Sequence, residues 1–223
     1  MMEMKGIKKS YHKNSVLNGV DMILHDGECV GIVGANGVGK STLLKIAVGA
    51  LRPDSGTIYL DGTSATPELL GEKIGYIPQE NPLFEELTVK DNLELWYKGD
   101  RDRLEKEQKE GNLFRFGIHD FYKKPVKKLS GGMKKRLSIC CALAEDPDIL
   151  VMDEPGAALD LSAKSMILDT IKEFTNVGKS VMITSHEIPE LMICDRVYGM
   201  KNGMITQLKR EINSDYLQKW IEG

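Results

Sequence analysis

The sequence contains no long run of apolar residues. Although 41% of its 223 residues are hydrophobic, apolar segments such as 149–152 end after a few positions, whereas a membrane-spanning helix needs about 20. The first ten residues mix lysines with a glutamate and lack the apolar segment of roughly 7 to 15 residues that marks a secretory signal. We therefore expect a soluble, cytoplasmic chain whose core suffices for one or at most two domains.

The chain has few cysteines, and neither sign of charge is in large excess. Lys and Arg number 30 against 33 Asp and Glu, so the formal net charge of -3 gives no reason to expect nucleic acid or an anionic membrane as a partner. The four cysteines show no C-x-x-C spacing, which disfavours a metal site or a disulfide framework. Cys140 and Cys141 lie in an apolar helical run, where we expect them to act as small buried hydrophobes.

Short segments rich in Val, Ile and Thr alternate with helical patterns, which predicts an α/β fold. Two of them, 149–152 and 181–184, are continuously apolar, as parallel strands buried on both faces are. Near the end of the chain, Asn202 and Gly203 predict a tight hairpin. The predicted strands are 28–34, 57–60, 73–78, 148–153, 180–184 and 196–200.

The segment from about 85 to 148 differs from its flanks. From Thr88 to about Ala144 the pattern is helical and highly charged, without a convincing strand. We interpret 1–223 as a single domain, in which 1–84 and 149–223 form an α/β core and about 85–148 form an inserted helical subdomain. The basic cluster at 123–128 could face an acidic partner or lipid headgroups, although a solvated basic turn is favoured.

A glycine-rich loop follows the first of these predicted strands. Glycines let backbone N–H groups surround a phosphate, and the helix N-terminus that follows favours the same anion. Lys40 is expected to reach the β and γ phosphates of a nucleotide, and the Ser41 hydroxyl to bind Mg²⁺. The loop matches G-x-x-x-x-G-K-[ST], in the required strand, loop and helix context, with Gly34, Ala35, Asn36, Gly37, Val38, Gly39, Lys40, Ser41 and Thr42.

Two adjacent carboxylates, Asp153 and Glu154, end the apolar segment 148–153. A metal-bound nucleotide needs a carboxylate near Mg²⁺, and hydrolysis needs a group that aligns or deprotonates water. The carboxyl ends of parallel strands are where open α/β sheets bind ligands. We expect Asp153 to hold Mg²⁺ through water and Glu154 to act on the attacking water. By itself the pair would equally fit ordinary solvation of a strand end.

The segment Leu129-Ser130-Gly131-Gly132-Met133 resembles the L-S-G-G-Q signature of the ATP-binding cassette (ABC) ATPases, and it precedes the Asp153 strand as it does in that family. The resemblance covers essentially the whole chain in the right order. The other matching positions are Tyr11 for the adenine-stacking aromatic, Gln79 for the Q-loop, Ala158-Leu159-Asp160 for the D-loop and His186 for the switch histidine.

The resemblance implies an α/β P-loop NTPase fold with a RecA-like, mostly parallel sheet core, antiparallel β elements and an inserted α-helical subdomain. It also implies ATP and Mg²⁺ as ligands, and a head-to-tail dimer in which each signature closes on the ATP of a second ATPase subunit. By position, it assigns catalysis to Lys40, Gln79, Glu154 and His186, Mg²⁺ binding to Ser41, Gln79 and Asp153, and ATP binding to Tyr11, the loop 34–42, Ser130, Gly131, Gly132, Met133 and Asp160.

The same resemblance implies an ATPase subunit of a transporter. The transmembrane permease would be a separate polytopic subunit, and this chain would lie at the inner face of the cell membrane. Leu83 and Phe84 could receive the permease or pack under the helical insert. The run 79–89 looks more like exporter ATPases than sugar importers. The alternative is a soluble ABC ATPase of an iron-sulfur assembly or another non-transport complex.

Three positions depart from the family pattern. Met133 stands in place of the usual Gln of the signature, Gly156 where Thr is frequent and Leu161 where Pro is common. We expect activity to survive the change at Met133, because that side chain is less directed at ATP than Ser130 and the glycines. We expect the changes at Gly156 and Leu161 to affect interface geometry and cooperativity between two sites, and not nucleotide binding.

Overall fold

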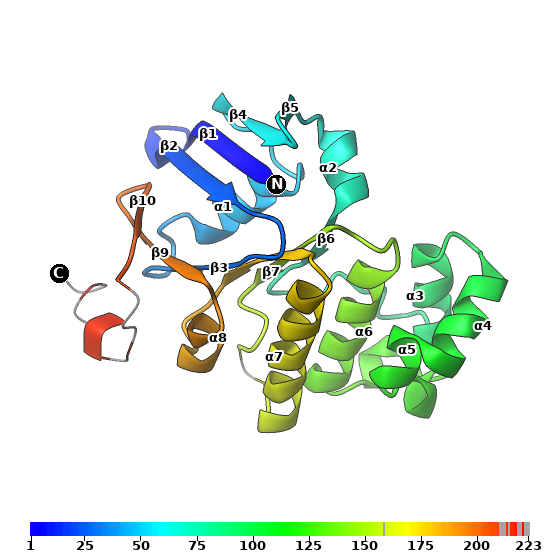
Figure 1. The fold of residues 1–223 in the computed structure, drawn as a ribbon. Helices are drawn as coiled ribbons and strands as arrows, with labels where there is room; N and C mark the ends of the chain where they lie inside the picture. Colours follow the sequence, from blue (N-terminus) through cyan, green and yellow to red (C-terminus); the bar gives the residue numbers. More distant parts are fainter. Residues whose placement is uncertain (158, 210–212, 214, 218–219, 221–223) are drawn as a thin grey trace.

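Two β-sheets organise the computed structural model, which describes residues 1–157, 159–209, 213, 215–217 and 220 (Figure 1). The larger sheet has the strand order β10-β9-β3-β8-β7-β6, and the smaller has the order β2-β1-β4-β5. The strands are β1 Met2–Tyr11, β2 Asn14–Leu24, β3 Cys29–Val33, β4 Ser55–Leu60, β5 Thr63–Ser64, β6 Ile74–Ile77, β7 Ile149–Asp153, β8 Ser180–Thr184, β9 Arg196–Lys201 and β10 Met204–Gln207.

The larger sheet is parallel except at one edge. β3 pairs in parallel with β8 and β9, and β7 pairs in parallel with β6 and β8, whereas β10 is antiparallel to β9. Every residue of β3, β7 and β8 is buried, as expected where helices cover both faces. The predicted hairpin joins β9 to β10, and Asn202 there has the positive φ of 52° that such turns favour.

Successive residues of the central strands point into two different cores. In β7, Ile149 and Val151 pack with α1 (Lys40–Ala47) and the antiparallel sheet, while Leu150 and Met152 pack with the helices on the opposite face. Figure 1 shows α1 lying between the antiparallel sheet and β3. The parallel pairing of these strands brings their carboxyl ends to one edge of the sheet, and packing on both faces holds them there.

Helices fill the part of the chain between β6 and β7, and no strand occurs among its described residues. Helices α3 to α6 pack against one another, and α6 also contacts α7 and β6 (Figure 1). Their apolar side chains, among them Leu93, Leu113 and Leu137, belong to the same core as Leu150 and Met152 of the sheet. The bounds are α3 Val89–Trp96, α4 Arg101–Glu110, α5 Asn112–Arg115, α6 Gly131–Leu143, with the 3₁₀ turns Ile118–Phe121 and Val126–Lys128 between α5 and α6.

The remaining helices are α2 Pro67–Lys73, α7 Leu161–Asn176 and α8 Ile188–Met192. Among the described residues, no helix combines the length and the apolar character needed to cross a bilayer. Cys140 and Cys141 are buried in the helical core, as predicted. Trp220, near the end of the chain, is among the described residues, and its ring lies against Gly199 of β9.

All six predicted strands are confirmed within two residues at each end. Antiparallel elements were expected, but β1 and β2, the longest strands among the described residues, could not be located from the sequence. Their pairing is irregular, with register shifts after Met4, Ile7 and Lys9 of β1. A bulge moves side chains to the other face, so the strict alternation that reveals a strand in the sequence is lost.

Candidate functional site

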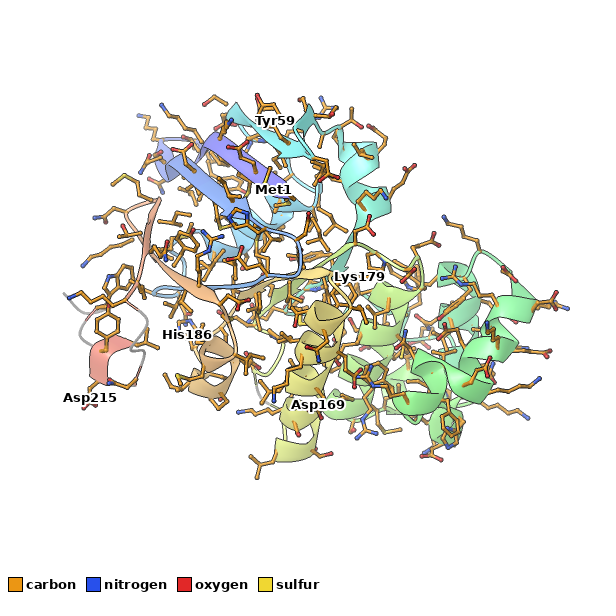
Figure 2. The ribbon with its side chains drawn as sticks, in the orientation of Figure 1. Met1, Tyr59, Asp169, Lys179, His186 and Asp215 are labelled. Carbon is orange, nitrogen blue, oxygen red and sulfur yellow. The ribbon has the colours of Figure 1, made fainter. Side chains whose placement is uncertain are left out.

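The carboxyl ends of four parallel strands lie along one edge of the larger sheet. Gly34 follows β3 directly, Gln79 lies two residues beyond β6, Asp153 is the last residue of β7, and His186 lies two residues beyond β8. Figure 2 labels His186, which stands just ahead of α8. Residues far apart in the sequence thus meet where an open α/β sheet binds its ligand.

The loop between β3 and α1 depends on glycine at particular positions. Gly37 and Gly39 have φ values of 78° and 115°, which favour glycine. A Cβ on Gly39 would lie 2.9 Å from Val16 Cγ1, and a Cβ on Gly34 would lie 2.5 Å from the Met200 carbonyl oxygen. The loop therefore keeps its backbone close against β2 and β9 only because these side chains are absent.

Lys40 begins α1, and its side chain is 5% exposed. Its ammonium donates to the carbonyl oxygens of Gly34 at 2.8 Å and Ala35 at 3.3 Å. The same nitrogen lies 3.5 Å from Glu154 Oε1. A buried lysine is uncommon unless it is paired, and these contacts hold its positive charge between the loop and the end of β7.

Asp153 and Glu154 are adjacent but have different partners. Asp153 is 3% exposed, and its Oδ1 accepts a hydrogen bond from the Thr184 hydroxyl at 2.6 Å. Glu154 has a φ of 45°, which is uncommon without glycine. Its N–H donates to the Thr184 hydroxyl at 3.0 Å, and its Oε2 accepts from Gln79 Nε2 at 3.3 Å. The left-handed turn at Glu154 directs its carboxylate toward Gln79 and Lys40.

His186 completes this group of side chains. Its Nε2 lies 3.1 Å from Lys40 Nζ and 3.5 Å from Glu154 Oε1. Burial lowers the pKa of His186, and the Lys40 ammonium lowers this pKa further against the opposing effect of Glu154. The imidazole is therefore mainly neutral at pH 7, and a neutral ring nitrogen accepts a hydrogen bond from Lys40.

Lys40, Gln79 and Glu154 line a pocket of about 330 Å³, a volume within the range of small-molecule sites. Gly39 caps α1 without a side-chain hydrogen bond from any described residue, so the first N–H groups of the helix are available to an anion. The pocket is lined by Val16, Asn36, Gly37, Gly39, Lys40, Ser41, Thr42, Gln79 and Glu154.

The side-chain oxygen atoms at this sheet edge also fit the ligand preference of Mg²⁺. In nucleotide sites this ion binds one or two carboxylates together with waters and substrate phosphates. The Ser41 hydroxyl lines the pocket, and the buried Asp153 carboxylate precedes Glu154 at the same edge. The residues present therefore fit a nucleotide carried with Mg²⁺, with Ser41, Asp153 and Gln79 as the oxygen donors.

The signature residues form a second helix N-terminus outside this pocket. Ser130 caps α6, and its hydroxyl accepts from the Met133 N–H at 3.3 Å. Asp160 caps α7 by accepting from the Ala163 N–H at 2.8 Å. A Cβ on Gly132 would be 3.8 Å from Asp160 Oδ2, so the two caps are neighbours. Ala158 of the predicted D-loop lies outside the described residues.

Tyr11 and the departures from the pattern have distinct environments. Tyr11 ends β1, is 45% exposed and is not among the described residues that line the pocket, so its role at adenine stays a prediction. A Cβ on Gly156 would overlap Glu190 Oε1, which explains glycine at that position. Leu161 begins α7 and is exposed.

Sequence reasoning missed two residues of the site. Thr184 ends β8 opposite Asp153 in the strand register and bonds both Asp153 and Glu154. The sequence carried a signal for Thr184, because it ends the predicted apolar strand 180–184. The carboxyl ends of parallel strands lie at the same edge of a sheet, so its hydroxyl could have been expected near Asp153. Val16 lines the pocket from β2, and no sequence pattern identified it.

The comparisons agree with this geometry. A model of the ABC transporter family matches residues 17–157. The linearmycin resistance ATP-binding protein LnrL of Bacillus subtilis is 36% identical over 88% of this chain. The matched region spans 65% of the length of LnrL. A Nod factor export ATP-binding protein of Rhizobium sp. is 36% identical over 91% of this chain and 68% of its own.

Solved structures have the same fold. An ATP-binding cassette solved as a dimer in a post-hydrolysis state with ADP and Pi superposes with a TM-score of 0.84, at 27% identity over 96% of this chain and all of its own. The ATP-binding subunit of another transporter reaches a TM-score of 0.88, at 26% identity over the full length of both chains. The fold is thus that of a P-loop NTPase.

Proposed function

The chain belongs to the ABC transporter family, and we propose from this that it binds and hydrolyses ATP to drive transport through a separate transmembrane subunit. The observation that carries the proposal is the cluster of Lys40, Glu154, Gln79 and His186 beside the uncapped N-terminus of α1. Positive charge, a carboxylate base and backbone donors meet there in one pocket.

Each side chain has a role that its contacts support. Lys40 and the loop amides bind the β and γ phosphates, and the α1 N-terminus adds its partial positive charge. His186 lies against Lys40 and contacts the γ-phosphate. Gln79 orients the water and the Glu154 carboxylate through its 3.3 Å hydrogen bond. Mg²⁺, when bound by Ser41, Asp153 and Gln79, neutralises charge on the phosphates.

Glu154 is the proposed general base. Its side chain is bonded at one oxygen by Gln79 and approached at the other by Lys40 and His186, so its position is determined on both sides. Asp153, buried and bonded to Thr184, is directed elsewhere. Glu154 therefore acts on the attacking water, and Asp153 is left to hold the metal.

The exposed signature supports a head-to-tail dimer. Ser130 and Gly131 are exposed at the N-terminus of α6, outside the pocket of their own chain. Their donors would contact ATP held by a second cassette, whether a copy of this chain or a related one. One related cassette has been solved as a dimer in two structures.

The first test replaces Glu154 with Gln, which keeps the shape but removes the base. We expect ATP to bind with unchanged affinity while turnover falls roughly 10² to 10⁴ fold. Gel filtration with Mg-ATP should show Glu154→Gln as a trapped dimer. Asp148→Asn, just before the amino end of β7, serves as the control. A monomeric elution profile at high concentration would contradict the sandwich mechanism.

An exposed aromatic residue supports docking on a permease. Phe84 is 58% exposed, and its backbone N–H and carbonyl oxygen are both bonded to the side chain of buried Asn92. The adjacent Leu83 is partly buried against the helical core, so the two expected docking residues divide between surface and packing. In the proposed organisation 1–84 and 149–223 form the core and about 85–148 form the helical subdomain. The permease docks where the two join, around Phe84.

Export is the proposed direction, since the similar proteins carry names of resistance and export systems. The second candidate is a soluble ATPase of an iron-sulfur assembly or another non-transport complex. Affinity purification of the tagged chain from detergent-solubilised membranes separates the two. We expect a polytopic membrane protein to co-purify, placing this chain at the cytoplasmic face, and Phe84→Asp to abolish its recovery. Recovery of soluble scaffold proteins alone would favour the second candidate.

A further inference from the structure

Two adjacent lysines of α6 have opposite environments. Lys134 reaches the surface and pairs there with Glu85. Lys135 is 3% exposed, although it stands in the basic run Lys134-Lys135-Arg136. A lysine is seldom buried to this extent unless its charge is used.

The ammonium of Lys135 is bonded to the segment that carries Gln79. Its Nζ donates to the carbonyl oxygen of Pro78 at 3.3 Å. Pro78 directly precedes Gln79, whose own amide donates to Glu154 Oε2 at 3.3 Å. A short path of hydrogen bonds and one peptide unit therefore joins the signature helix to the proposed general base.

Two buried carboxylates accompany this ammonium. Burial lowers the pKa of Lys135 to about 8, and the charges of Asp153 and Glu190 oppose that shift. Glu190 is 2% exposed; its Oε2 accepts from the Ser185 hydroxyl, and its Oε1 has no hydrogen-bond partner among the described residues. Lys135 thus supplies positive charge close to two buried carboxylates, Asp153 at the end of β7 and Glu190 of α8.

We propose that Lys135 is a positioning residue, which holds Gln79 against Glu154 by fixing the Pro78 carbonyl to the signature helix. It touches neither nucleotide nor metal, and it acts only through Gln79. Movement of α6 relative to the core would then be transmitted directly to the residue that orients the attacking water. The inference rests on the proposed ATPase function and adds a residue to which that function assigns no role.

The test compares Lys135→Met with Lys134→Met in steady-state ATP hydrolysis. Met keeps most of the length and volume of the Lys135 side chain without its charge, so we expect the variant to fold. We expect kcat of Lys135→Met to fall roughly 10- to 100-fold, the effect typical of a residue that supports a site from outside it. The KM for ATP should change by less than about twofold. Lys134→Met should match the wild type. A wild-type kcat in Lys135→Met would overturn the proposal.

A double-mutant cycle separates positioning from a structural effect. If Lys135 acts only through Gln79, Lys135→Met should lower kcat no further in a Gln79→Ala background. Additive losses would mean that Lys135 acts elsewhere and would overturn the proposal. Lys135→Gln, which keeps a donor for Pro78, should recover most of kcat, and no recovery would contradict the role of the hydrogen bond. Lys135→Leu takes the place of Lys135→Met in the cycle if the latter does not fold.

The wild-type chain distinguishes the failure of this inference from the failure of the proposed function. If wild-type protein does not hydrolyse ATP, the ATPase function itself is wrong. If the wild type is active and Glu154→Gln is inactive, while Lys135→Met behaves as wild type, only the positioning role is wrong.

Discussion

Helices α1 and α6 both begin at glycine-rich segments, yet of the two only α1 begins inside a formed pocket. Gly39 caps α1 with a φ of 115° and no side-chain hydrogen bond, and buried Lys40 follows it. Ser130 caps α6 through its own hydroxyl, and both it and Gly131 face solvent. The N-termini of α1 and α6 therefore differ more in their surroundings than in their sequence pattern.

The surroundings decide what each helix start can bind. A helix dipole contributes only about 0.3 to 1 kcal/mol to an anion at an exposed N-terminus. At α1 the buried ammonium of Lys40 and the sheet edge with Glu154 and His186 add charge and donors in a partly enclosed space. At α6 those additions must come from another molecule. The α1 site should bind ATP in one chain, whereas the α6 site should act only on ATP held by a partner.

Removing the ammonium at α1 should have the largest effect. Lys40→Met keeps the apolar stem, and we expect affinity for ATP in the single chain to fall roughly 10- to 100-fold, because hydrogen bonds to charged groups are worth about 1.5 to 3 kcal/mol. Turnover and dimer formation should be lost with it. Isothermal titration calorimetry measures the affinity, and Lys45→Met, exposed on the same helix, is the control. Unchanged binding in Lys40→Met would show that the loop is not the phosphate site.

The same contrast explains how much of the site could be predicted from the sequence. The α1 loop has fixed spacing because phosphate contact demands glycine at set positions, so Gly34, Gly39 and Lys40 could be found directly. Asp153 and Glu154 could be found because they end an apolar strand. The structure adds that Glu154 lies in contact with Lys40, Gln79 and His186, which depends on strand order and not on spacing.

Other features depended on long-range packing and could not be predicted. β1 and β2 were not located, because their register shifts break the alternation of buried and exposed residues. No role was predicted for Lys135, which lies in the basic run 134–136. Its one sequence signal is helical period, which places it on the face of α6 that also carries Ile139 and Ala142, both buried. Periodicity gives the face but not the partner, and Pro78 lies far away in the sequence.

A negative charge at the α6 start should have a smaller and different effect. Gly131 has open space around the position of a Cβ, so Gly131→Asp should fold, and an acid in the first turn suits the helix dipole. We expect unchanged affinity for ATP in the single chain, but turnover about tenfold lower, since a like charge near the partner's phosphates costs roughly 1.4 kcal/mol at a partly screened site. Gly131→Ser, which adds a small neutral side chain, should retain near wild-type turnover. If Gly131→Asp instead weakened ATP binding in the monomer, the N-termini of α1 and α6 would contact the same nucleotide in one chain. The proposal that α6 acts only on ATP held by a partner would then be wrong.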